Sequence, residues 1–126
     1  MELVVLTEEF SICKLMDYSK VDFSRPFVFT GSTDEEKSLV CPSRLAPADT
    51  LGRSDGWRAF RIGGILDFSL VGILSRISAV LAENAIGLFA VSTFNTDYIL
   101  TKKEDFGRAL QLLSSSGFDI KYLDEI

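Results

Sequence analysis

The 126-residue chain contains no histidine, and this absence limits its chemistry more than any other feature of the sequence. Without histidine there is no Ser-His-Asp or Cys-His arrangement to activate a nucleophile, and most zinc and iron sites lose a common ligand. Enzymes can work without histidine, but it is the most frequent general base. Charged residues such as Arg58, Asp67 and Asp97 could supply acid–base groups, but they show no recognisable catalytic spacing. The sequence therefore predicts a protein that is not an enzyme and needs no cofactor or metal.

Long runs of basic or apolar residues are also missing. The formal net charge is −5 and no basic run exceeds Lys102-Lys103, so neither a nucleic acid nor a membrane is expected as a partner. No segment approaches the roughly 18 consecutive apolar residues of a membrane-spanning helix. Residues 1–9 lack the basic start and the cleavage site of a signal peptide. The two cysteines, Cys13 and Cys41, form no CxxC motif and fit half-buried thiols in a reduced cytoplasmic protein better than a disulfide.

What the chain does have is enough apolar material for a real core. Hydrophobic residues make up 47% of it, and ten of them are Phe, so the chain is expected to be ordered. Its length suits one domain or two small fused subdomains.

The most informative stretch runs from a strand through a glycine turn into a helix. Strand residues at 57–62 are followed by Gly63 and Gly64, which supply backbone freedom. Asp67 or Ser69 can then cap a helix whose apolar residues are spaced by three and four: Leu70, Ile73, Leu74, Ile77 and Leu81. With Gly72 in its first turn, this helix start could hold a carboxylate, although many such junctions bind nothing.

The order of the remaining elements indicates the fold. In the first half, strands are expected at 10–15, 27–30 and 38–41; in the second half, strands at 57–62, 86–92, 97–101 and 118–122, with one helix ending at Asn84 or Ala85 and another at 104–116. Strand, helix, strand, strand, helix, strand is the ferredoxin-like pattern. The predicted hairpins at 29–40 and 89–100 also align without a gap at an offset of 60 (92 − 32 = 60). Phe29, Ser32 and Thr33 of the first recur as Phe89, Ser92 and Thr93 of the second. This echo predicts an internal duplication.

The second half resembles the ACT domain. The resemblance rests on the ferredoxin-like order together with GILDFSLVGIL (Gly64–Leu74), LAENAI (Leu81–Ile86) and STFNTDYIL (Ser92–Leu100). It is closest to the small tandem-ACT proteins of bacteria, which are related to the ACT domains of the cytosolic arginine sensors of animals. It implies an α+β fold of two ferredoxin-like units, with antiparallel sheets and helices on one face. Residues 1–56 would form a reduced N-terminal ACT-like unit, and residues 57–126 a complete ACT domain.

The resemblance also implies a regulatory or sensor module that binds a small molecule, typically an amino acid, where two ACT units meet. These units could belong to one chain or to a homodimer. The implied ligand-facing positions lie on the strand–helix turn and on the facing hairpin: Asp67, Phe68, Ser69, Leu70, Val71, Gly72, Ser92, Thr93, Asn95, Thr96 and Asp97.

The chemistry of these positions suits a zwitterion. Helix N–H groups and the Ser69 hydroxyl can bind a carboxylate, and Asp97 or Asp67 can bind an ammonium. Structural roles are equally open for Asp67 as a helix cap and for Asp97 as a solvated charge. A second hypothesis is an interaction or oligomerisation module with a vestigial ligand site. One position departs from the family pattern: Ala85 replaces the usual glycine, so Asn84 is expected to take the left-handed conformation at the helix end.

Overall fold

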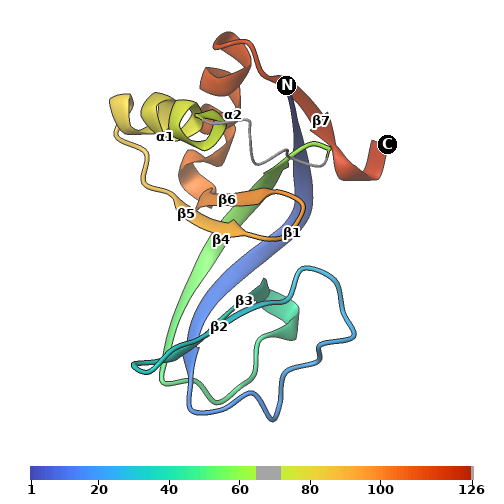
Figure 1. Cartoon of the computed structure of the whole chain (residues 1–126), viewed down its shortest axis with the longest axis vertical. Helices are drawn as coiled ribbons and strands as arrows, with labels where there is room; N and C mark the ends of the chain where they lie inside the picture. The colour runs from blue at the N-terminus through green and yellow to red at the C-terminus, as the bar shows by residue number, and fades with distance from the viewer. Residues whose placement is uncertain (65–71, 126) are drawn as a thin grey trace. The chain divides into compact units, whose positions relative to one another are not determined.

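The computed structural model describes residues 1–64 and 72–125 (Figure 1). Among these residues, no helix is long and apolar enough to cross a membrane. The elements in chain order are β1 (Glu2–Leu15), β2 (Phe29–Ser32), β3 (Lys37–Pro42), η1 (Ser43–Leu45), β4 (Gly52–Ile62), α1 (Ile73–Glu83), β5 (Phe89–Ser92), β6 (Asp97–Lys102), α2 (Lys103–Ser115), β7 (Asp119–Tyr122) and η2 (Leu123–Glu125).

The chain forms two compact units. Unit 1 comprises Met1–Thr7 and Arg58–Ile126, and unit 2 comprises Glu8–Trp57. The long strands β1 and β4 each contribute residues to both units. That the chain divides into a reduced and a complete ACT domain, at 1–56 and 57–126, stays a prediction.

Unit 1 contains the predicted strand–helix–strand–strand–helix–strand order, from β4 to β7. Its strands lie in the order β5-β6-β4-β1, with β7 beside β1. The N-terminal strand β1 therefore lies between β4 and β7; its residues 10–15 were predicted as a strand and its residues 2–9 were not. It pairs in parallel with β7, from Glu2 opposite Asp119 to Val5 opposite Tyr122. The prediction of purely antiparallel sheets is therefore wrong at this pair of strands. The buried run Leu3–Leu6 explains why this segment is a strand, because a continuous apolar run suits a strand covered on both faces.

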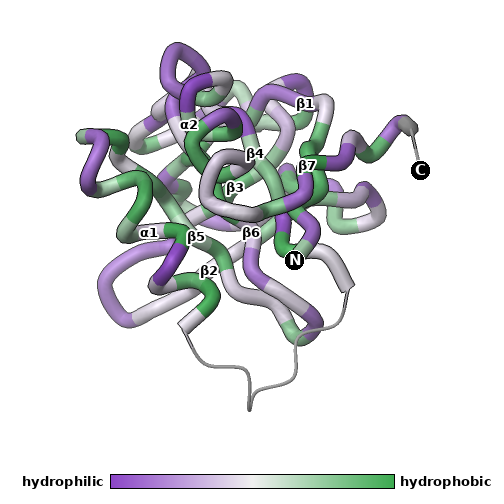
Figure 2. The backbone as a smooth tube through the Cα atoms, turned by 90° about the horizontal axis from the view of Figure 1, so that it is seen from above, coloured by the Kyte–Doolittle hydropathy of each residue, from purple (hydrophilic) through white to green (hydrophobic). Residues whose placement is uncertain are grey.

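Both helices of unit 1 pack against one hydrophobic cluster. On α2, the predicted inner residues Phe106, Ala109, Leu110 and Leu113 are all buried in it. On α1, Ile77 and Leu81 are buried and Ile73 and Leu74 pack against them, as predicted, while Leu70 lies outside the described residues. Hydrophobic and hydrophilic residues follow one another along α2, as expected for a helix with one covered face (Figure 2).

Unit 2 is built around a smaller cluster that includes both cysteines. Its strands lie in the order β2-β3-β1-β4, with β1 and β3 antiparallel. Cys13 and Cys41 are free thiols and are fully buried rather than half-buried, and burial raises the pKa of Cys41 to about 11. The segment after β1 contains turns and is tied to the β2–β3 hairpin by Tyr18, whose hydroxyl lies 3.1 Å from the carbonyl of Gly31 and 2.9 Å from that of Ser38.

Several strand starts differ from the predicted ones. The strand predicted from Phe27 begins at Phe29, because Phe27 has a left-handed φ of 64° that no regular strand accommodates. Strand β4 begins at Gly52 rather than Trp57, and β5 begins at Phe89 rather than Ile86. Ile86 is buried in the core, but its N–H donates to Leu81 O in the turn that ends α1.

The two hairpins have the same register at the predicted offset. Phe29 lies opposite Val40 and Ser32 opposite Lys37; the corresponding pairs are Phe89 with Leu100 and Ser92 with Asp97. The turns are closed by matching backbone bonds, Thr33 N–H to Glu36 O at 2.9 Å and Thr93 N–H to Thr96 O at 2.8 Å. The sequence echo thus corresponds to a repeated local structure.

Both helices end in a Schellman motif, and one of them does so without glycine. After α2, Gly117 has a φ of 101°, its N–H bonds to Ser114 O, and the N–H of Phe118 bonds to Leu113 O. After α1, the residue in the left-handed conformation is Ala85 itself, with a φ of 58°, while Asn84 has a φ of −110°. The prediction that Asn84 would take this conformation is therefore wrong. The two bonds that correspond to those after α2, from Ala85 N–H to Ala82 O and from Ile86 N–H to Leu81 O, place the left-handed residue at Ala85, one position after Asn84.

Replacing Ala85 with glycine should stabilise the protein by about 0.5–1 kcal/mol. Relief of the left-handed strain, about 1–2 kcal/mol, exceeds the extra entropy that glycine loses on folding, roughly 0.5–1 kcal/mol. Urea denaturation measures the change, and Ala82→Gly, within α1, is the matched control that should destabilise. Equal destabilisation by both substitutions would contradict a left-handed Ala85.

Candidate functional site

The structure describes six of the eleven predicted ligand-facing residues: Gly72, Ser92, Thr93, Asn95, Thr96 and Asp97. Asp67, Phe68, Ser69, Leu70 and Val71 lie outside the described residues. The six belong to unit 1 and occupy two places, the N-terminal end of α1 and the turn between β5 and β6.

At the start of α1, the first N–H groups have no side-chain cap among the described residues. The helix begins at Ile73, so Gly72 is the N-cap residue rather than a member of the first turn as predicted. Gly72 has a left-handed φ of 88°, and its carbonyl accepts from the N–H of Arg76 at 2.8 Å. No described side chain caps this end, and a Cβ on Gly72 would meet no described atom within 4 Å. Uncapped N–H groups and the positive end of the helix dipole favour an anion at this position.

The β5–β6 turn presents a carboxylate that is already oriented. The hydroxyl of Ser92 donates to Asp97 Oδ1 at 2.6 Å, while no described residue bonds to Asp97 Oδ2. Thr93 holds the turn closed, since its hydroxyl donates to Thr96 O at 3.0 Å. Asn95 is exposed, and Phe94 at the tip is 85% exposed. The turn therefore offers one fixed negative charge among polar side chains.

A buried hydrogen bond fixes this turn at the end of β4. Thr96 is 6% exposed, and its hydroxyl donates to the carbonyl of Ile62 at 2.7 Å. Ile62 is the last residue of β4, immediately before the two glycines that lead toward α1. Gly64 has a φ of 78° and so uses the predicted backbone freedom. Gly63 does not have a positive φ; it favours glycine because a Cβ there would lie 3.0 Å from the Cβ of Glu2. Thr96 thus holds the hairpin beside the strand end.

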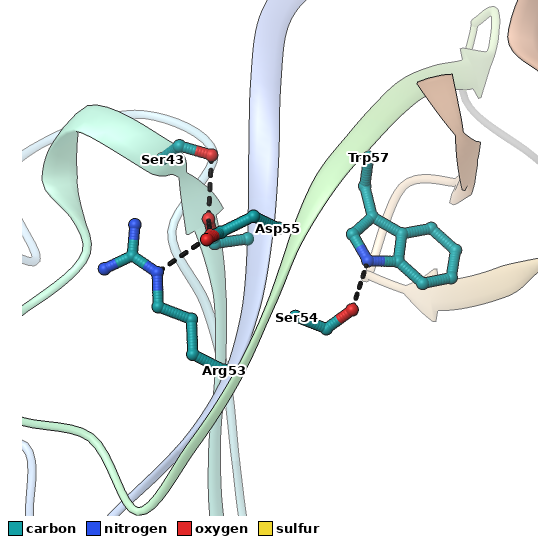
Figure 3. Close-up of polar contacts among 6 residues, drawn as sticks. Ser43, Arg53, Ser54, Asp55 and Trp57 are labelled. Carbon is teal, nitrogen blue, oxygen red and sulfur yellow. Dashed lines mark hydrogen bonds and ion pairs between the residues drawn. The ribbon is translucent and has the colours of Figure 1, made fainter. Parts of the chain in front are cut away.

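A polar cluster in unit 2 was missed from the sequence (Figure 3). The fully buried Ser11 hydroxyl lies 2.5 Å from Asp55 Oδ1 and 2.7 Å from Ser43 Oγ, and Arg53 Nε donates to the same Asp55 oxygen at 2.8 Å. No sequence signal pairs Ser11 with Asp55, because the contact spans 44 positions. The members of the cluster are bonded to one another, so the cluster links β1, η1 and β4.

Arg58, considered above as an acid–base group, also has a structural role. Its guanidinium lies 4.9 Å from the ring centroid of Phe106, and it donates to Leu6 O at 3.1 Å. Its Nε is buried without a hydrogen-bond partner among the described residues. Nor does any group of three or more His, Cys, Asp or Glu side chains in the described ranges suit a metal ion.

Replacing Thr96 with valine should destabilise the protein by about 1–3 kcal/mol, because Ile62 O loses its buried partner with little change in volume. The matched control is Thr7→Val, at an exposed position of β1 where the hydroxyl has no hydrogen-bond partner among the described residues, with an expected change within about 0.5 kcal/mol. Thermal and urea denaturation compare the two variants. If Thr96→Val were as stable as Thr7→Val, the Thr96 bond would not hold the hairpin.

Known proteins share this fold across most of the chain. A family model of the ACT domain matches residues 53–115. The protein Atu0741 of Agobacterium tumefaciens is 30% identical, with a TM-score of 0.85, over 96% of this chain and 92% of its own. The protein VC0802 of Vibrio cholerae, described as a possible transport protein, is 18% identical with a TM-score of 0.71, over 90% of this chain and 88% of its own.

An aspartate kinase of Clostridium acetobutylicum, described as an allosteric enzyme, shares the fold at 13% identity and a TM-score of 0.61, over 85% of this chain and 32% of its own. No curated protein matches the chain. The family model covers half of the chain, and the Agobacterium protein matches nearly all of it. The chain therefore belongs to the ACT domain family.

Proposed function

We propose that the protein is a non-catalytic regulatory module that binds an amino acid in unit 1. ACT domains are typically regulatory modules that bind small molecules such as amino acids. The observation that carries the proposal is the Thr96–Ile62 hydrogen bond of 2.7 Å, which holds the β5–β6 turn beside the strand end that leads toward α1. The free thiols of Cys13 and Cys41 support a cytoplasmic location. The matching hairpins support a relationship to the small tandem-ACT proteins of bacteria, which are related to the ACT domains of the cytosolic arginine sensors.

In this proposal the ligand carboxylate binds at the start of α1. The donors are the N–H groups that follow Gly72, which no described side chain caps. The absence of a side chain on Gly72 lets an oxygen approach the backbone. Asp67, Phe68, Ser69, Leu70 and Val71 are proposed to complete this side of the site, as the resemblance implies.

The ligand ammonium binds the hairpin turn. Asp97 is the acceptor, because Ser92 already orients one of its carboxylate oxygens. No described residue bonds to the other oxygen, so a ligand can bind there. Thr93 and Asn95 are exposed beside it and provide further polar contacts. Thr96 has its hydroxyl committed to Ile62, so it acts mainly by positioning the turn.

Calorimetry and thermal-shift screening of the twenty amino acids test the proposal. A ligand that binds only the folded state raises the melting temperature, because it adds RT ln(1 + [L]/Kd) to the free energy of unfolding. At least one amino acid should stabilise the wild-type protein. If none of the twenty amino acids bound or raised the melting temperature, with protein that is folded by circular dichroism, the proposal would be overturned.

Replacing Asp97 with alanine should weaken binding of that amino acid roughly tenfold or more, since a hydrogen bond to a charged group is lost, and should leave the fold intact. The deaminated analogue of the ligand, which lacks the ammonium, should bind wild type and Asp97→Ala equally. Glu104→Ala, at an exposed carboxylate in the first turn of α2, is the matched control and should bind as wild type. Unchanged affinity in Asp97→Ala would remove Asp97 from the site.

A second candidate function is a protein-interaction or homodimerisation module with a vestigial ligand site. The observation that favours it is Phe94, a large apolar side chain that is 85% exposed at the tip of the β5–β6 hairpin. Size-exclusion chromatography with light scattering, with and without amino acids, distinguishes the two functions. An assembly state that depends on Phe94 and ignores every amino acid would favour this second candidate.

A further inference from the structure

Unit 2 contains a cavity of about 340 Å³ that the proposed function does not use. It lies between the turn segment that follows β1 and the segment that precedes β4, and its lining includes Leu15, Asp17, Lys20, Pro47, Asp49 and Leu51. Its volume falls within the roughly 300–1,000 Å³ that is typical of small-molecule sites. We infer that this cavity is a second binding site, for a zwitterionic α-amino acid with an aliphatic side chain.

The walls of the cavity are held in place by contacts within unit 2. Leu51 N–H donates to Lys14 O at 2.8 Å, which fixes one wall against the end of β1. On the other wall, Tyr18 anchors the turn segment through the carbonyls of Gly31 and Ser38. The cavity is therefore formed before a ligand arrives, which lowers the entropic cost of binding.

Both charges of a zwitterion find a counter-charge at the mouth. Lys20 Nζ and Asp49 Oδ2 form an ion pair at 3.0 Å that joins the two walls, and their side chains are 68% and 84% exposed. An ion pair this exposed contributes little to stability, so a ligand can replace the contact between Lys20 and Asp49 at a small cost in free energy. The ligand carboxylate then binds Lys20, and its ammonium binds Asp49.

Asp17 adds a second carboxylate on the same wall as Lys20. Its Oδ1 accepts from Ser19 N–H at 3.0 Å and from the Ser19 hydroxyl at 2.6 Å, which lowers the pKa of the Asp17 carboxyl and keeps it charged. No described residue bonds to its Oδ2, which is therefore open to an ammonium. Two carboxylates and one lysine favour a ligand with both charges over a simple anion.

The remaining lining is apolar and sets the class of side chain. Leu15 and Pro47 are buried at the cavity, while Met16 and Leu51 are 77% and 60% exposed at its edge. An aliphatic side chain covers these exposed groups and is itself removed from water. The two exposed residues also border a neighbouring hollow of about 280 Å³ at the β2–β3 turn, the equivalent of the β5–β6 turn of the proposed site.

Titration of isotope-labelled protein with L-leucine, followed by amide chemical shifts, tests the inference. Saturable shifts are expected at Met16–Lys20 and Asp49–Leu51. Isocaproate, which lacks the ammonium, and isopentylamine, which lacks the carboxylate, should not reproduce them. If either single-charge analogue produced the same shifts with equal affinity, or if folded protein gave no shifts at these residues, the inference would be overturned.

Lys20→Met, which keeps the aliphatic stem, should weaken this binding at least tenfold, since a charged hydrogen-bond donor is lost. Lys121→Met, at an exposed lysine of β7 in unit 1, is the matched control and should bind L-leucine as wild type. Because shifts are read residue by residue, the two sites fail separately. The proposed function fails if none of the twenty amino acids shifts Ser92–Asp97, whatever L-leucine does at Met16–Lys20. Retention of the Met16–Lys20 response in Lys20→Met would count against the second site.

Discussion

The hydrogen bond between the Thr96 hydroxyl and the Ile62 carbonyl is the contact on which the candidate site depends. It joins residues 34 positions apart and is buried, so water cannot replace it. One end lies in the hairpin that carries Asp97, and the other is the last residue of the strand that leads toward α1. A binding site needs its groups fixed to within a fraction of an ångström, and a single buried contact at such a corner supplies that constraint.

Local sequence patterns predicted most of unit 1. The spacing of apolar residues located α1 and α2 with their buried faces, and the echo between the halves located two hairpins that have the same register. The first part of β1, residues 2–9, was not predicted because Leu3–Leu6 is a continuous apolar run without alternation, a pattern that does not distinguish strand from helix. Its parallel pairing with β7 joins the two ends of the chain, which no local pattern reports.

For the site, the sequence indicated the residue types but not the role of each residue. Serine, threonine and aspartate at 92–97 were expected to face a ligand. In the structure, Ser92 orients Asp97 and Thr96 anchors the turn. Such roles depend on partners distant in the chain. At the end of α1 the deciding contacts are local. The family's glycine at position 85 led to the prediction that Asn84 would take the left-handed conformation, whereas the bonds of Ala85 N–H to Ala82 O and of Ile86 N–H to Leu81 O place that conformation at Ala85.

In the proposed function, non-catalytic ligand binding is the central property of this protein. Two charged groups that could have suggested an active site have structural partners: Arg58 has Phe106, and Asp55 has Ser11. The most direct measurement is a crystal structure of the protein grown with a mixture of amino acids. Under the proposed function, ligand density is expected with its carboxylate at the N–H groups after Gly72 and its ammonium at Asp97. A well-ordered structure in which the protein's own side chains fill that corner would contradict it.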